Sequence, residues 1–182
     1  QQLELMLSEV LKLVPRALVL FAWSASKSFL QYGLRVGSLV AVTSDDDERR
    51  RIASALSYSC RGTWSNVNAG GMAAIARMLL DPDRRARVER ERATFVDLLA
   101  RRVTRFNERA SAAGLPYPRY DGGFFTMVFE KDAHAAAERL KADGVFVVPQ
   151  VGGLRIALSS VAEKDVDRLV ESIVKATRPD AG

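Results

Sequence analysis

Apolar positions near the start of the chain predict one helix followed by two strands. Leucine and valine recur at helical spacing over residues 1–14, which predicts an amphipathic helix. The apolar run 17–23 is short and suits a strand buried on both faces, and residues 38–42 suit a second strand, with a polar loop at 24–27 between them. Because two strands do not form an independent sheet, the first strand is expected to need neighbours that this chain does not obviously supply.

Helical spacing dominates the middle of the chain. A helix is expected over 45–58, because acidic residues in its first turn interact favourably with the helix dipole. Asparagines and glycines predict a loop over 60–71, followed by a helix over 72–80. The hydrophobic pattern of residues 83–113 predicts one long helix that ends at Gly114.

The last third of the chain alternates strand and helix patterns. Strands are expected over 124–129, 145–148 and 154–158, and helices over 133–142 and 163–176. Short connections between such elements are typical of a compact α/β layer.

Composition and charge narrow the class of protein. The 182 residues are 48% hydrophobic and 27% charged, as in a globular protein with a core. The net charge is +5, but the arginines between residues 83 and 109 alternate with acidic residues. That pattern indicates a solvated helix face, so no nucleic-acid partner is expected. The longest apolar run, 17–23, is too short to cross a bilayer, so no membrane partner is expected either.

The histidine and cysteine counts restrict the chemistry. One histidine, His134, makes a Ser-His-Asp triad improbable, and one His with one Cys cannot build a zinc site. No metal is therefore expected. The single cysteine, Cys60, excludes an internal disulfide and fits a reducing cytoplasm.

The loop after the first predicted strand gathers residues that suit a phosphate-bearing aldehyde. Such a cofactor needs a lysine to form a Schiff base, hydroxyls for its phosphate and an arginine for a bidentate grip on that dianion. Ser24, Ser26, Lys27 and Arg35 provide this set between the two strands. The residues alone leave an ordinary surface loop open as the alternative.

This loop resembles the lysine signature of class I aminotransferases, which depend on pyridoxal phosphate (PLP). The matching residues are Ser-Ala-Ser-Lys at 24–27 and Gly-Leu-Arg-Val-Gly at 33–37, whereas Gln31 departs from the family's small or aliphatic residue. The resemblance implies that Lys27 carries PLP and shuttles a proton between the amino acid and the cofactor. It also implies that Ser24 and Arg35 bind the phosphate, with Ser26 beside them.

A second segment, Arg-Gly-Thr-Trp-Ser-Asn at 61–66, is similar to one of the aspartate and aromatic aminotransferase branch. There the segment serves the active site of the neighbouring subunit, which implies a homodimer. Arg61 would bind the distal carboxylate of a dicarboxylic substrate, and Ser65 and Asn66 would lie near the partner's cofactor. The branch continues with two prolines where this chain has valine and asparagine. The alternative for Arg61 is an arginine that interacts with the last carbonyls of a helix.

A third similarity concerns the late strand at 153–158, which resembles the strand that presents the substrate-binding arginine of fold type I aminotransferases. A carboxylate is planar and suits the two parallel N–H donors of Arg155. The apolar residues at 154, 156 and 158 share one strand face, and Arg155 lies on the other. Phe125, in a segment similar to the family's Gly-apolar-Phe, would line the substrate pocket. The alternatives are a solvated edge arginine and a core aromatic.

Together these similarities imply an α/β protein of PLP-transferase fold type I. Residues 1–82 would be the C-terminal part of the PLP-binding large domain, 83–114 a long connecting helix, and 115–182 the small C-terminal α/β domain. The implied function is a cytoplasmic aminotransferase that moves an amino group between an aromatic or dicarboxylic amino acid and a 2-oxo acid.

The family's other cofactor-binding elements precede its lysine strand and cannot be located in this sequence. The chain is therefore expected to be a fragment that is inactive without the N-terminal half. Two alternatives stay open: another fold type I enzyme, such as a β-lyase or decarboxylase, and a non-catalytic effector-binding domain of a regulator.

Overall fold

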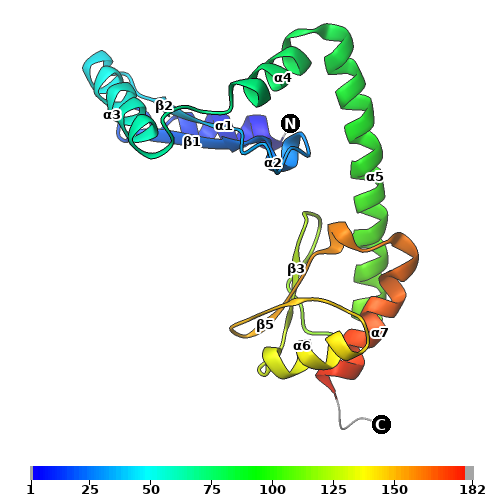
Figure 1. The fold of residues 1–182 in the computed structure, drawn as a ribbon. Coiled ribbons are helices and arrows are strands. Elements are labelled where there is room, and N and C mark those ends of the chain that lie inside the picture. The colour runs from blue at the N-terminus through cyan, green and yellow to red at the C-terminus, as the bar shows by residue number, and fades with distance from the viewer. Residues whose placement is uncertain (1, 179–182) are drawn as a thin grey trace. The chain divides into compact units, whose positions relative to one another are not determined.

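The computed structural model describes residues 2–178, with side chains from Glu4 onward. The chain divides into two compact units, residues 1–86 and residues 87–182, called here the first and the second unit. Figure 1 shows the elements of each.

The first unit contains the two strands that the sequence predicts. β1 (Val19–Ser24) pairs antiparallel with β2 (Gly37–Val42), from Val19 opposite Val42 to Ser24 opposite Gly37. The expectation that the first strand is buried on both faces is wrong for the described chain, because Val19 is its only buried residue. A two-stranded ladder leaves both of its faces uncovered unless other elements pack on them.

Apolar side chains nevertheless occupy both faces of this ladder. Leu20 and Leu39 lie on one face, and Trp23 and Val40 lie on the other, as the alternation of strand side chains requires. All four are exposed. The residue types therefore suit a strand pair whose two faces are both packed against other parts of a protein.

The helices of the first unit differ from the predictions mainly in their ends. α1 (Gln2–Leu11) lies within the predicted helix 1–14, whose residue 1 is outside the described residues. α3 (Asp46–Trp64) begins as predicted, after the N-cap Asp45, but continues six residues beyond Tyr58. Gly62 lies inside the extension, because a glycine costs a helix only about 1 kcal/mol.

Two further differences from the predictions concern the segments 60–71 and 24–28. The predicted loop 60–71 is reduced to residues 65–68, and α4 (Ala69–Leu80) begins three residues earlier than expected, after the N-cap Asn68. Residues 24–27 are also not simply a polar loop. Ser24 caps a single helical turn, α2 (Ala25–Ser28), because its hydroxyl accepts a hydrogen bond from the amide of Ser26.

The second unit has the predicted mixture of helices and strands. α5 (Pro82–Ala112) forms as expected and ends before Gly114, which adopts a φ of 63°. β3 (Thr126–Phe129), β4 (Val148–Gln150) and β5 (Gly153–Ile156) form an antiparallel sheet in the order β3-β5-β4.

Helices complete the second unit. α6 (Ala133–Ala142) has the predicted bounds, and the predicted helix 163–176 forms as a 3-10 turn, Glu163–Asp165, followed by α7 (Val166–Thr177). The strand expected at 145–148 begins only at Val148. The amide of Val145 donates instead to the carbonyl of Leu140 and closes the end of α6, so it does not enter the ladder.

A single hydrophobic core holds the second unit together. It joins α5, the sheet, α6 and α7 through fully buried side chains such as Phe106, Val128, Leu140 and Ile173. Phe106 also contacts two tyrosine rings edge-on within the same core.

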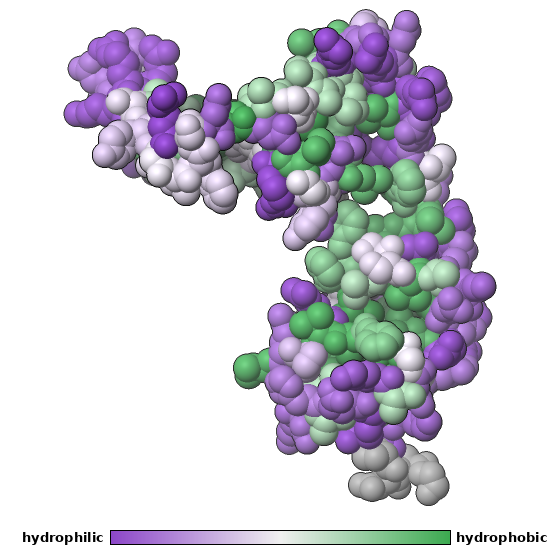
Figure 2. Space-filling model, viewed as in Figure 1, coloured by the Kyte–Doolittle hydropathy of each residue, from purple (hydrophilic) through white to green (hydrophobic). Residues whose placement is uncertain are grey.

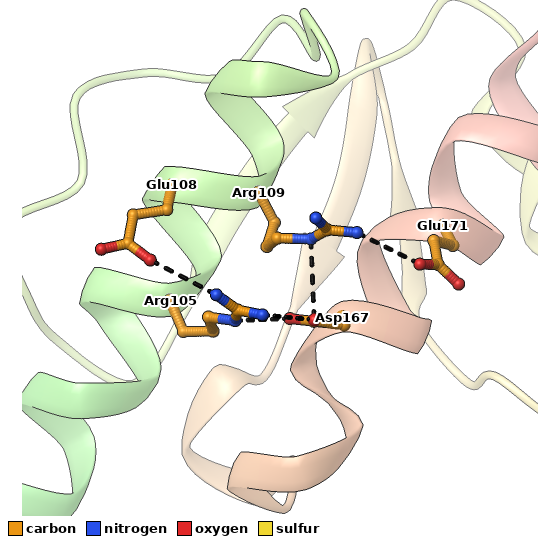
Figure 3. A network of polar contacts seen from close by, with 5 residues as sticks. All are labelled: Arg105, Glu108, Arg109, Asp167 and Glu171. Carbon is orange, nitrogen blue, oxygen red and sulfur yellow. Dashed lines mark hydrogen bonds and ion pairs between the residues drawn. The ribbon is translucent and has the colours of Figure 1, made fainter.

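Outside this core, a row of ion pairs joins α5 to α7 and to the 3-10 turn that precedes it. Arg101 pairs with Glu163, Arg105 with Asp167 and Arg109 with Glu171, so each partner recurs every four residues. This is the spacing of one helix face. Arg105 holds both oxygens of Asp167, at 2.7 and 2.6 Å, and Figure 3 shows that pair together with Glu108 and Arg109.

The central ion pair, between Arg105 and Asp167, makes the folding stability of the second unit depend on pH. The hydrogen bond from Arg105, helped by the charges of Arg105 and Arg109, lowers the pKa of Asp167 below its ordinary value of 3.8. Because this pKa is lower in the folded than in the unfolded protein, the stabilisation is complete above 3.8. It is lost as the pH falls through the folded value.

We therefore expect Asp167→Asn to flatten the acid limb of the pH–stability curve. Urea unfolding midpoints of the second-unit core, measured from pH 6 down to the acid limit, test this. Asp97→Asn changes an exposed residue of α5 and is the matched control. A wild-type-like loss of stability below pH 3.8 in Asp167→Asn would contradict the assignment.

Candidate functional site

The predicted cofactor loop is closed by the end of the β1–β2 ladder. Ser24 and Gly37 are opposite one another in the ladder, and the amide of Ala25 donates to the carbonyl of Val36 at 3.0 Å. The ladder allows no side chain at position 37, because a Cβ there would lie 2.6 Å from the carbonyl oxygen of Trp23. Residues 26–35 therefore form a loop with fixed ends.

This closure brings three of the predicted phosphate-binding side chains together. The hydroxyls of Ser24 and Ser26 are 3.0 Å apart, and Nη1 of Arg35 donates to the Ser26 hydroxyl at 3.3 Å. The same Nη1 donates to the carbonyl of Tyr32 at 2.9 Å. Two hydroxyls and a guanidinium thus converge on one side of the loop.

The chemistry of this set fits the phosphate of PLP. A phosphate dianion accepts several hydrogen bonds. An arginine and neighbouring hydroxyl groups can donate them, and the arginine also balances the negative charge. Among the described residues, no carboxylate forms an ion pair with Arg35, so its charge is available to an anion. The predicted cofactor lysine, Lys27, lies in α2, next to Ser26, and its side chain is exposed.

Lys27 and Arg35 share a neighbour that the sequence did not single out. The ammonium of Lys27 lies 4.9 Å from the centre of the Tyr32 ring, and the guanidinium carbon of Arg35 lies 5.0 Å from it. Both distances are within the range of a cation–π contact. Only its position in the sequence could have indicated Tyr32 as a site residue, since it comes five residues after the lysine and three before the arginine.

The turns of the loop occur at side-chain-bearing residues. Leu30 and Arg35 have φ values of 54° and 52°, in the left-handed region that non-glycine residues rarely enter. A residue held in this region costs free energy that the surroundings must offset, and such residues cluster at functional sites. The left-handed φ of Arg35 therefore supports its assignment to the site.

A small hydrophobic core and a hydrogen bond from one asparagine hold the loop against α4. Ala25, Val36 and Ile75 are buried together, with Phe29 packed against them. Asn68 accepts from the amide of Gly71 as the cap of α4, and its Nδ2 donates to the carbonyl of Leu34 at 3.0 Å. The loop and α4 are thus tied together one residue before Arg35.

The predicted partner-subunit residues lie elsewhere in the first unit. Arg61 is in the last turn of α3, Ser65 is its C-cap and Asn66 follows in the connection to α4, and all three are exposed. Ser65 donates its amide to the Arg61 carbonyl, and the Asn66 side chain accepts from the amide of Val67. These contacts lie within the end of α3 and its connection to α4.

Arg155 and Phe125 belong to the second unit and contact one another. The guanidinium carbon of Arg155 lies 4.9 Å from the centre of the Phe125 ring. The opposite face of the strand is buried through Leu154 and Ile156, as the sequence predicts. Nε of Arg155 is buried, and within residues 2–178 it has no hydrogen-bond partner.

The sheet face around Arg155 is unusually apolar for an exposed surface. Phe125 and Phe129 flank Met127, the residue opposite Arg155 in the ladder, and are 46% and 50% exposed. Figure 2 shows hydrophobic side chains at the surface of this unit. A half-buried cation on such a face is suited to a carboxylate whose remaining atoms are apolar.

Metal sites and membrane-spanning helices are two further features that residues 2–178 do not contain. No group of three or more His, Cys, Asp or Glu side chains there could hold a metal ion. Over the same residues, no helix has both the length and the hydrophobicity needed to span a membrane.

Residues 4–173 match the family described as aminotransferase class I and II. The chain belongs to this family. An aspartate aminotransferase of Pseudomonas aeruginosa is 29% identical over 154 residues, which are 84% of this chain and 38% of that protein. The chain thus spans well under half the length of this curated relative.

Solved structures agree with the family. An aminotransferase from Anaerococcus prevotii superposes with a TM-score of 0.82 and 27% identity, over 86% of this chain and 38% of that one. The aromatic-amino-acid aminotransferase from Burkholderia pseudomallei, covalently bound to pyridoxal phosphate, gives 0.72 and 28% over 90% and 41%. The predicted α/β fold, fold type I, is confirmed.

Replacing Asn68 should separate its two roles beneath the loop. Asn68→Ala loses both the helix cap and the bond to Leu34, and we expect it to destabilise α4 by about 1 kcal/mol. Asn68→Asp keeps a capping oxygen but no donor, so it should free only the loop. Amide hydrogen exchange over residues 33–37 and 69–75 distinguishes the two. Unchanged exchange in α4 of Asn68→Ala would rule out the capping role.

Proposed function

We propose that this chain is part of a PLP-dependent aminotransferase, which moves an amino group between an amino acid and a 2-oxo acid. The observation that carries the proposal is the convergence of Ser24, Ser26 and Arg35 beside Lys27 on one closed loop. The family match and the PLP-bound relative support it.

Each residue of the loop has a distinct role in this proposal. PLP, when bound, supplies an aldehyde that condenses with amines and a ring that accepts electrons. Lys27 would hold the cofactor and would move a proton to and from the Cα of the amino acid. Arg35 and Ser24 hold the phosphate, with Ser26 connecting them.

The substrate would be held by its carboxylates. Arg155 suits the α-carboxylate, because its guanidinium is half-buried, rests on Phe125 and has no acidic partner among the described residues. Phe125 lines the same side. Aromatic or dicarboxylic amino acids are the proposed substrates, since relatives named for aspartate and for aromatic amino acids are both similar to this chain.

Arg61, Ser65 and Asn66 are proposed to act in the active site of a partner subunit. Their exposed position at the end of α3 leaves them accessible to another chain. Arg61 would bind a distal carboxylate there, and Ser65 and Asn66 would approach the partner's cofactor. The proposal therefore includes a homodimer. A cytoplasmic location goes with it, which the lone Cys60 fits.

The proposed activity requires more protein than the described chain. Both apolar faces of the β1–β2 ladder are exposed, and exposed apolar faces of this kind mark surfaces that other protein covers. We propose that residues 1–82 belong to a PLP-binding large domain, 83–114 to a connecting helix and 115–182 to a small domain. The rest of the large domain would come from the N-terminal half of the enzyme.

Reductive trapping tests the central assignment. Incubation of the chain with PLP followed by borohydride should label Lys27 above the other lysines, as peptide mapping will show, and Lys27→Arg should lose that label. Lys131→Arg removes another exposed lysine and should leave it unchanged. A dominant label elsewhere would contradict the proposal.

The same preparation should not transaminate by itself. Amino transfer from glutamate to a 2-oxo acid should be absent from the 182-residue chain, because it spans only 38% of the aspartate aminotransferase to which it is similar and we propose that the cofactor site needs the other part. A coupled assay for the product 2-oxo acid measures this. Turnover that disappears in Lys27→Arg would show instead that the chain is sufficient.

A further inference from the structure

Tyr32 is the residue that touches both cations of the loop. Its ring lies 4.9 Å from the Lys27 ammonium and 5.0 Å from the Arg35 guanidinium carbon, and its carbonyl accepts from Nη1 of Arg35. The side chain is nevertheless 65% exposed. A tyrosine that is so exposed contributes little to a core, so these contacts are its main interactions with the fold.

The two cations would otherwise tend to separate. Like charges on an exposed loop repel, and each sits on a long side chain with many rotamers. The face of an aromatic ring is electrostatically negative and attracts a cation placed over it. One ring that contacts both side chains therefore opposes their repulsion and limits their rotamers.

We propose that Tyr32 is a positioning residue that holds Lys27 and Arg35 at a fixed separation, so that one ligand can meet an amine and a phosphate-binding guanidinium together. This rests on the proposed function of Lys27 as the cofactor lysine. Tyr32 makes no bond to the cofactor in this proposal. It acts through the two side chains that do.

The consequence is a preference of Lys27 for aldehydes that carry a phosphate. The Lys27 amine adds to the aldehyde carbon, a C=N bond replaces the C=O bond and water leaves. The phosphate of the same molecule interacts with Arg35 and Ser26. A ligand held at two points reacts at a higher effective concentration than one held at a single point. That advantage depends on the separation of the two points.

The test compares two aldehydes, PLP and pyridoxal, which differ in the phosphate. Borohydride delivers hydride to the carbon of the C=N bond and fixes the label. Labelling of Lys27 is measured relative to Lys131 in the same sample. The PLP-to-pyridoxal ratio at Lys27 cancels the intrinsic reactivity of the amine and reports the phosphate contribution alone.

Three variants distinguish the ring from the hydroxyl and from the volume of the side chain. Tyr32→Phe keeps the ring and should keep the ratio. Tyr32→Leu and Tyr32→Gln, both suited to an exposed position, lack the ring, and each should lower the ratio about two- to fivefold, the range of an exposed cation–π contact. Wild-type ratios in both ring-free variants would overturn the proposal.

A second readout requires no cofactor. The ε-methylene protons of Lys27 and the δ-methylene protons of Arg35 should be shifted upfield by the ring current in wild type and in Tyr32→Phe. They should return to ordinary values in Tyr32→Leu. Ordinary shifts in wild type would also overturn the proposal, whatever the labelling shows.

The two readouts separate this inference from the proposed function. Ring-current shifts without selective PLP labelling of Lys27 would reject Lys27 as the cofactor lysine while showing that Tyr32 holds the pair. Selective labelling whose phosphate preference does not depend on the ring would reject the role of Tyr32 and leave the cofactor assignment in place.

Discussion

The backbone closure between β1 and β2 is the constraint on which the candidate site depends. Ser24 stands opposite Gly37, and the amide of Ala25 binds the carbonyl of Val36. Chain entropy would otherwise keep the two ends of the ten-residue loop 26–35 apart. Because the ends are joined, the hydroxyl of Ser26 and the guanidinium of Arg35 lie within hydrogen-bonding distance although the two residues are nine positions apart in the sequence.

The two units differ in how much of their β-sheet is packed against their own helices. The second unit buries a continuous core around Phe106, so its sheet is covered on one face by its own helices. The ladder of the first unit has the small cluster of Ala25, Val36 and Ile75 under the loop and exposed apolar side chains along the strands. The lysine loop is therefore locally well defined on a ladder whose residues suit a larger sheet.

Sequence patterns predicted the features that depend on local chemistry and missed those set by contacts. The strands around Lys27, the long helix before Gly114 and the facing of Arg155 follow from periodicity and turn residues. The extension of α3 past Tyr58 does not, because the asparagines and glycines that predict the loop lie beyond Trp64, and a helix tolerates the one glycine before it, Gly62. Tyr32 has no periodic signal, since its contacts come from the folded path of an irregular loop.

The groups that each arginine contacts indicate whether its role is structural or ligand-binding. Arg101, Arg105 and Arg109 all face carboxylates, so their charge is neutralised within the fold. Arg35 and Arg155 instead rest on the rings of Tyr32 and Phe125 and have no ion pair among the described residues. A ring orders a guanidinium without neutralising it, so both charges stay available to an anion. The phosphate and the carboxylate of the proposed reaction are anions of this kind, and a carboxylate partner at either position would have competed with them.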